Sequence, residues 1–237
     1  MLFVVDFDGT ISKRDTIDQL LEKFADPSWE ELEKDWLDGK MTALECMSKQ
    51  IDMVDSDLLT LENFFRSVQL DESFLPFYEY VKKFAKLVIA SDGLDHSIKV
   101  ATRQAGWPEI QTYSNRLNYK ERGIEITFPL RDPDCKGGNG MCKCAVADYV
   151  SKKVGGPVVL IGDGKSDACL SLHADIVFAK SSLIKHCEKN NVKHHTYSSL
   201  LNFDDIDSLI LIYLQTFDLL LVMYLILHQC MSHQLQI

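Results

Sequence analysis

Three short apolar segments, each followed at once by a polar loop, constrain the fold of this chain more than any other feature. They span residues 2–5, 87–90 and 158–161 and consist almost entirely of Leu, Val, Ile, Phe and Ala. Continuous apolar runs of this length are typical of strands buried on both faces of a sheet. Segments with helical patterns separate them, so we expect an α/β fold with a parallel sheet and helices on both faces.

The polar loops after these segments hold most of the candidate functional residues. They read DFDGT at 6–10, SDG at 91–93 and GDGKSD at 162–167. In open parallel sheets, ligands bind outside the carboxyl ends of the strands. We therefore expect the three loops to converge on one crevice.

Two stretches between the strands predict additional structure. Residues 17–80 have apolar spacing typical of several helices, more than one crossover needs, and we expect a small helical cap over the crevice. Alternation within residues 115–130 around a Glu-Arg-Gly turn predicts a hairpin, and a helix is expected over 145–154. We divide the chain into a core of 1–14 and 85–206, a cap of 15–84, and an apolar tail of 207–237.

The composition excludes some classes of protein. The 237 residues are 46% hydrophobic and 25% charged, as in globular proteins. A formal net charge of −10 argues against a nucleic-acid partner. Seven cysteines without a leader-like N-terminus favour reduced thiols and a cytoplasmic location.

The C-terminal tail contains an apolar segment at 209–227 that reaches the length of a membrane span. Asp218 near its middle and the lack of a flanking basic cluster argue against insertion. A packed or partner-binding helix is favoured, and a tail anchor is the alternative.

The first loop places two carboxylates beside each other. Asp6 and Asp8 follow a buried strand at i and i+2, so both point to one side of an extended loop. This arrangement suits Asp6 as a nucleophile that attacks phosphorus and Asp8 as the general acid and base. The alternative is a helix cap or Asx-turn, which accounts for either residue alone but not for the pair.

The last loop supplies further carboxylates. Asp163 and Asp167, together with Asp6 and Asp8, form a candidate set of oxygen ligands for Mg²⁺. A capped turn is the alternative, because Gly-Asp-Gly is a common turn signal.

Candidate phosphate contacts come from two more positions. Ser91 and the backbone amides of Asp92 and Gly93 can donate hydrogen bonds at the start of the next helix. Lys143, just before the helix over 145–154, is the lysine we favour for neutralising phosphate charge. Lys136 and Lys165 are its competitors.

The loop before Lys143 also contains three cysteines. Cys135, Cys142 and Cys144 have the spacing C-x₆-C-x-C, which is not that of a standard zinc finger. With a fourth ligand they could hold Zn²⁺, but we favour reduced loop cysteines.

Taken in this order, DFDGT, Ser91, Lys143 and the GDGKSD loop resemble the four motifs of the haloacid dehalogenase superfamily, over about residues 2–206. The resemblance implies a Rossmann-like core with a small helical cap of the C1 type, and Mg²⁺ as the cofactor. It implies Asp6 as nucleophile, Asp8 as acid and base, Ser91 and Lys143 on the phosphate, and Asp163 as a metal ligand supported by Asp167.

Within this superfamily the chain is most similar to subfamily IB, and there to the branch of the methionine-salvage phosphatase. Phosphoserine phosphatases and phosphoethanolamine/phosphocholine phosphatases are the alternatives, and Asp15 stands where phosphoserine phosphatases place a carboxylate for the substrate amine. The resemblance implies a small phosphorylated metabolite as substrate.

A catalytically weak, regulatory phosphate-binding protein is the alternative from another functional class. We expect Asp15, Trp36 and Glu45 to influence the choice of substrate, and the sequence does not define an oligomeric state.

Overall fold

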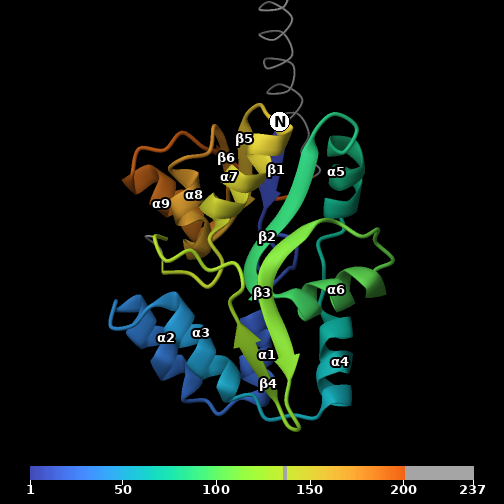
Figure 1. The fold of residues 1–237 in the computed structure, drawn as a ribbon, viewed down its shortest axis with the longest axis vertical. Coiled ribbons are helices and arrows are strands. Elements are labelled where there is room, and N and C mark those ends of the chain that lie inside the picture. The colour runs from blue at the N-terminus through green and yellow to red at the C-terminus, as the bar shows by residue number, and fades with distance from the viewer. Residues whose placement is uncertain (136–137, 201–237) are drawn as a thin grey trace, which may run out of the picture. The chain divides into compact units, whose positions relative to one another are not determined.

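The computed structural model of the protein describes residues 1–135 and 138–200 (Figure 1). Residues Met1–Tyr197 form one compact unit, which contains every helix and strand named below. The apolar segment 209–227, for which we expect a packed helix or a tail anchor, lies outside the described residues. Within the described ranges, no helix is long and apolar enough to cross a membrane.

A seven-stranded sheet has the strand order β4-β3-β2-β1-β5-β6-β7. Its neighbouring strands are parallel except β3 and β4, which pair antiparallel. The strands are β1 (Leu2–Val5), β2 (Lys86–Leu94), β3 (Thr112–Tyr119), β4 (Ile124–Thr127), β5 (Val158–Gly162), β6 (Ile176–Ala179) and β7 (His195–Thr196). The predicted parallel sheet and the predicted hairpin are therefore both present.

The helices follow the expected pattern around this sheet. They are α1 (Thr16–Phe24), α2 (Trp29–Leu37), α3 (Ala43–Asp52), α4 (Leu58–Ser67), α5 (Phe74–Val81), α6 (Asp95–Gln104), α7 (Lys143–Val154), α8 (Ala168–Ser171) and α9 (Ser181–Lys189), with a 3₁₀ turn at Lys165–Asp167. Helix α7 begins two residues before the predicted start. It ends at Gly155, whose φ of 72° is in the left-handed region that favours glycine.

Helices cover both faces of the sheet because alternate residues of its strands point to opposite sides. Val4 of the central strand β1 lies in one apolar cluster with Val146 and Val150 of α7. Its neighbour Phe3 faces the other way and packs edge-to-face on Phe77 of α5, with ring centroids 5.9 Å apart. Figure 1 shows α7, α8 and α9 on one side of the sheet and α5 and α6 on the other. The fold class is thus the predicted α/β class.

A second apolar cluster lies beyond the carboxyl ends of the strands. It joins α1, α3 and α4 to the end of β2 and to the β3–β4 hairpin, which lie together in Figure 1. Its buried members are Ile17, Leu20, Leu21, Ile51, Val54, Leu61, Phe64, Phe65, Leu94, Leu117 and Ile124. The hairpin therefore shares a core with the helices between residues 16 and 67. The division into a core and a cap of 15–84 stays a prediction.

Strand β2 differs from the sequence-based expectation. A helix was expected to begin around Ser91, but the strand continues to Leu94 and α6 begins at Asp95. The physical reason is that β2 pairs with β3. The register of this pairing shifts after Ala90, and the pairing continues at Leu94, whose partner is Asn115. The amides of residues 91–93 are therefore part of an extended strand and do not form a helix N-terminus.

Candidate active site

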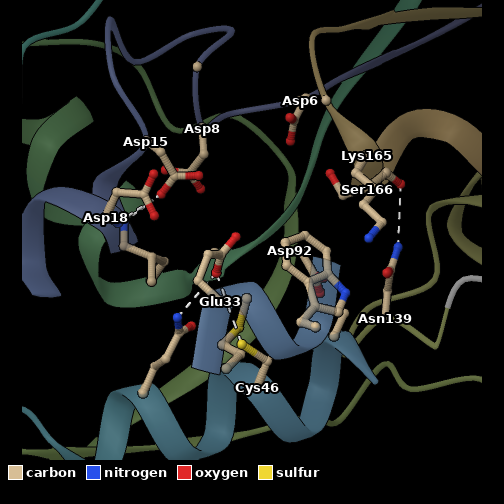
Figure 2. A pocket seen from close by; sticks show the side chains of 18 of the residues that line it. Asp6, Asp8, Asp15, Asp18, Glu33, Cys46, Asp92, Asn139, Lys165 and Ser166 are labelled. Atoms are coloured by element: carbon tan, nitrogen blue, oxygen red, sulfur yellow. Dashed lines mark hydrogen bonds between the residues drawn. The ribbon is translucent and has the colours of Figure 1, made fainter. Parts of the chain in front are cut away.

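The loops after β1 and β5 and the carboxyl-terminal part of β2 meet at one place, as expected for parallel strands. The Ser91 hydroxyl of β2 donates to Asp8 Oδ2 at 3.0 Å, which links the first two segments. The Thr10 hydroxyl donates to Asp163 Oδ1 at 3.4 Å, which links the first segment to the loop after β5. Figure 2 shows Asp6, Asp8 and Ser166 around the same pocket.

A buried lysine holds the first carboxylate of this site. Lys143 begins α7, and its Nζ lies 2.7 Å from Asp6 Oδ1 and 2.5 Å from Asp167 Oδ1. It also donates to Ser166 Oγ at 3.0 Å. An ammonium group has three N–H donors, so these contacts use all of them. The lysine chosen from the sequence thus reaches two of the carboxylates.

Burial and charge act in opposite directions within this network. Burial and then the neighbouring Asp167 raise the pKa of Asp6 well above its ordinary value, although Lys143 opposes the rise. For Lys143, burial alone would lower the pKa, but the charges of Asp167 and Asp6 outweigh it and the pKa is raised. The lysine is therefore held in its charged form between the two carboxylates.

Three carboxylates form a group that can bind a metal ion. Asp6, Asp163 and Asp167 each place an oxygen within 4.8 Å of the others. No other such group of three His, Cys, Asp or Glu ligands was found in residues 1–135 and 138–200. An all-oxygen donor set suits a hard divalent cation. Burial, followed by Asp167, raises the pKa of Asp163 to about 6, and a bound cation would oppose that rise. The residues therefore fit a divalent metal.

Asp167 also shapes the loop that carries Asp163. Its Oδ2 accepts the backbone N–H groups of Asp163 and Gly164, both at 3.1 Å. Across the site, Gly9 has a φ of 70°, and a Cβ there would lie 2.5 Å from Asp163 Oδ2. A side chain at Gly9 would therefore clash with the metal-ligand candidate. This close approach explains the glycine in DFDGT.

Asp8 lies outside the three-carboxylate group and has its own partners. Its Oδ1 accepts the backbone N–H of Thr16 at 2.9 Å and the Thr16 hydroxyl at 2.5 Å, while Oδ2 accepts from Ser91. Gly93 leaves room for this carboxylate, because a Cβ there would collide with Asp8 Oδ2. The carboxyl group predicted as acid and base is thus held by hydroxyl and amide donors and not by a lysine.

The Asp92 carboxylate is used in hydrogen bonds to two other segments. It accepts the backbone N–H of Met141 at 2.9 Å and the side-chain amide of Asn115 at 3.0 Å. These bonds connect β2 to β3 and to the loop before α7. A phosphate contact from Asp92 would have to come from its backbone amide, and that role stays a prediction.

A pocket of about 240 Å³ opens beside the carboxylates, between the strand-end loops and the helices α1, α2 and α3 (Figure 2). Three acidic side chains line it in addition to the site residues: Asp15, Asp18 and Glu33. Its apolar lining is Ile17, Trp36, Ala43, Cys46 and Met47. The pocket thus combines an acidic wall with an apolar one.

Two of the three residues expected to select substrate lie in this pocket. Asp15 lines it and also caps α1, because its Oδ1 accepts the N–H groups of Ile17 and Asp18 at 2.8 and 3.1 Å. Trp36 lines it beneath Lys165, whose Nζ lies 4.0 Å from the ring centroid. Glu45 is not among the lining residues, because its carboxylate is used in a capping box with Thr42 at the start of α3.

Sequence reasoning missed several residues around the site. Asp18 had a signal, since it lies one turn after Asp15 on an amphipathic helix. Lys180 follows β6 directly and donates to the backbone carbonyl of Thr10 at 3.5 Å. Glu33 and Thr16 had no distinguishing sequence signal.

Of the two competing lysines, one lines the same pocket and the other lies outside the described residues. Lys165 is exposed and stacks on Trp36, and Lys136 is outside the described residues. The cysteines described, including Cys135, Cys142 and Cys144, are free.

Comparisons with known proteins identify phosphatases similar to this chain. No family model matches the chain. A 2-hydroxy-3-keto-5-methylthiopentenyl-1-phosphate phosphatase from Bacillus pumilus is 28% identical over 201 residues, which cover 83% of this chain and 86% of that protein. A protein of the same name from Geobacillus kaustophilus is 29% identical over 213 residues, covering 88% and 95%.

Solved structures share the fold at lower identity. A phospho-aspartyl intermediate analogue of phosphoserine phosphatase gives a TM-score of 0.63 at 18% identity, covering 84% of this chain and 93% of that one. A substrate-bound phosphoserine phosphatase complex gives 0.65 at 18%, covering 85% and 95%. The chain has the fold of these phosphoserine phosphatases. The resemblance to phosphatases seen in the sequence is confirmed, as is the expectation of a phosphoric monoester hydrolase.

Proposed function

We propose that the protein is a Mg²⁺-dependent phosphatase that hydrolyses a small phosphorylated metabolite through an aspartyl-phosphate on Asp6. The observation that carries this proposal is the position of Asp6, buried against Lys143 and beside Asp163 and Asp167. A carboxylate fixed in this way is a preorganised nucleophile.

The chain's own residues divide the work as follows. Asp6 attacks phosphorus while Asp8, held by Thr16 and Ser91, gives a proton to the leaving oxygen. Asp8 then takes a proton from the water that hydrolyses the aspartyl-phosphate. Lys143 orients Asp6 and supplies positive charge, and Ser91 can exchange its bond to Asp8 for one to phosphate.

Asp6, Asp163 and Asp167 would hold the metal ion. When bound, Mg²⁺ offsets the repulsion between the carboxylates and the phosphate and makes the phosphorus more electrophilic. The single positive charge of Lys143 cannot balance three carboxylates, which supports the need for a divalent cation.

For the substrate, the names of the relatives favour 2-hydroxy-3-keto-5-methylthiopentenyl-1-phosphate. The apolar wall with Trp36 and Met47 supports this choice, since it can receive a methylthio group. The acidic wall favours a second candidate, a phosphate monoester with an amino group such as phosphoserine or phosphoethanolamine.

The test of the chemistry is the substitution Asp6→Asn, with p-nitrophenyl phosphate as the probe. We expect turnover to fall by about 10³-fold or more, because the amide cannot act as the nucleophile. Asp52→Asn, at the exposed end of α3, is the matched control and should leave turnover unchanged. Chelation by EDTA should also stop turnover, and Mg²⁺ should restore it. Full activity of Asp6→Asn would contradict the mechanism.

The test of the substrate is a panel of phosphate monoesters compared by kcat/KM. The panel includes the methylthio-ketopentenyl phosphate, phosphoserine, phosphoethanolamine and a neutral alkyl phosphate. Preference for the amines over the neutral phosphate would show that the acidic wall determines substrate specificity. Preference for the methylthio compound would show that the apolar wall determines it.

A further inference from the structure

Two cysteine thiols lie next to each other outside the candidate active site. Cys144 of α7 and Cys169 of α8 have their sulfur atoms 3.3 Å apart, and both are free. Each residue is partly exposed, so a small oxidant can reach the pair. Neither residue contributes to the site described above.

This pair connects the same two segments as the catalytic ion pair. Cys144 follows Lys143 directly, and Cys169 comes two residues after Asp167. Lys143 and Asp167 are themselves in contact at 2.5 Å. A covalent link between the sulfurs would therefore act on the backbone that carries both charged groups.

Two other thiols nearby, those of Cys142 and Cys135, are hydrogen-bonded to each other. Cys142 caps α7, where its sulfur accepts the N–H of Ala145 at 3.5 Å. In the described parts of the chain, no three thiols lie within 4.8 Å of one another. A tetrahedral zinc site needs its sulfurs about 4 Å apart, so the arrangement favours a thiol pair over a metal cluster.

We propose that Cys144 and Cys169 form a reversible disulfide under peroxide, and that this disulfide lowers turnover at the active site. One thiolate attacks a peroxide oxygen, the O–O bond breaks, and a sulfenic acid and water form. The second thiolate then attacks the sulfenyl sulfur, and the S–S bond forms as a second water leaves. Both sulfurs are oxidised by one electron each and hydrogen peroxide is reduced to two waters.

The expected loss of turnover follows from the geometry. The sulfur separation must shorten from 3.3 Å to about 2.0 Å, which draws α7 and α8 together. Displacements of about 1 Å in a catalytic group can lower turnover by about 10²-fold. We expect kcat to fall by at least about tenfold and to recover in dithiothreitol. This readout rests on the proposed phosphatase function, whereas the disulfide itself does not.

The test is peptide mapping of the reduced full-length protein after treatment with hydrogen peroxide and blocking of free thiols. Tryptic cleavage places Cys144 on residues 144–152 and Cys169 on residues 166–180, each with a single cysteine. We expect these two peptides to be linked in the oxidised protein and separate after reduction. Absence of the link in folded protein, or a link to Cys142 in its place, would overturn the proposal.

Variants separate the disulfide from general oxidation. Cys144→Ser and Cys169→Ser should each lose the linked peptide and keep their turnover in peroxide, while Cys135→Ser should behave like the unsubstituted protein. Equal inactivation of Cys144→Ser would overturn the regulatory role, and so would unchanged turnover in fully linked protein. If the reduced protein hydrolyses no phosphate ester, the proposed function fails, while the peptide map still tests the disulfide.

Discussion

The strand-end carboxylates and the helical wall of the pocket differ in how their charges are compensated. Asp6 and Asp167 are buried and share one lysine, so each charge has a partner within a few ångströms. Asp18 and Glu33 line the same pocket from helices, and Lys165, above Trp36, is the only Lys or Arg among the described residues that line it. In the strand-end region, Lys143 and a bound metal ion together would compensate the negative charge of the carboxylates. In the helical wall, negative charge without such a partner faces the cavity.

This difference separates chemistry from recognition. Balanced, buried groups keep one geometry, as a nucleophile and its supports require. Uncompensated groups at a pocket wall can be neutralised by a ligand that brings positive charge. The two regions should therefore respond differently to substitution.

The largest expected effect is at Lys143. Lys143→Met removes the counter-charge of two buried carboxylates, and we expect it to lower the free energy of unfolding by about 3–5 kcal/mol. Turnover of p-nitrophenyl phosphate should fall with it by about 10²–10³-fold. Urea denaturation in metal-free buffer and steady-state kinetics measure the two effects.

Lys165→Met is the matched control from the other region. This lysine is exposed and stacks on Trp36, so its loss should change the free energy of unfolding by no more than about 0.5 kcal/mol. Equal destabilisation by both substitutions would show that the two regions do not differ in the way described.

The strand-end region was largely predictable because its signals are local. A buried apolar run followed by acidic residues identified Asp6, Asp8 and Asp163, and parallel strands bring such loops together at one edge. The choice of Lys143 was predictable from its position before a helix. The path of β2 was not, because its extension through Ser91 to Leu94 depends on pairing with Asn115, which is a tertiary interaction.

The helical wall was less predictable. Asp15 was expected in the pocket and lies there, but Glu45 was expected on equal grounds and is used in a capping box. Glu33 reaches the cavity only because α2 packs on α3 over the strand ends, which the sequence does not encode locally. Helix periodicity identifies the buried face and does not fix which polar residues face a cavity.

A smaller effect is expected at Asp15, which has both a structural and a recognition role. Asp15→Ala should lower the free energy of unfolding by about 1 kcal/mol through loss of the α1 cap, and Asp15→Asn should not, since Asn caps equally well. Both variants should raise KM for phosphoethanolamine about tenfold if this carboxylate binds the amine. Thermal unfolding and kinetics on the same preparations distinguish the two roles. An unchanged KM in both variants would limit Asp15 to capping.

The smallest expected effect is a pH dependence at Asp18. Burial, followed by the nearby Glu33, raises the pKa of Asp18 to about 6, so this carboxyl is mostly ionised at pH 7.5 and mostly protonated at pH 5.5. Only the ionised form attracts an amine, so KM for phosphoethanolamine should rise as the pH falls through about 6.

Titration of the substrate phosphate and of Asp163 also alters KM in this range, but it does so equally in Asp18→Asn. The informative quantity is therefore the ratio of KM in the variant to KM in the unsubstituted protein. It should be about three at pH 7.5 and approach one at pH 5.5, because solvent still reaches part of the Asp18 side chain and screens its charge. A ratio that stays constant across this range would place the recognition of the amine elsewhere on the wall.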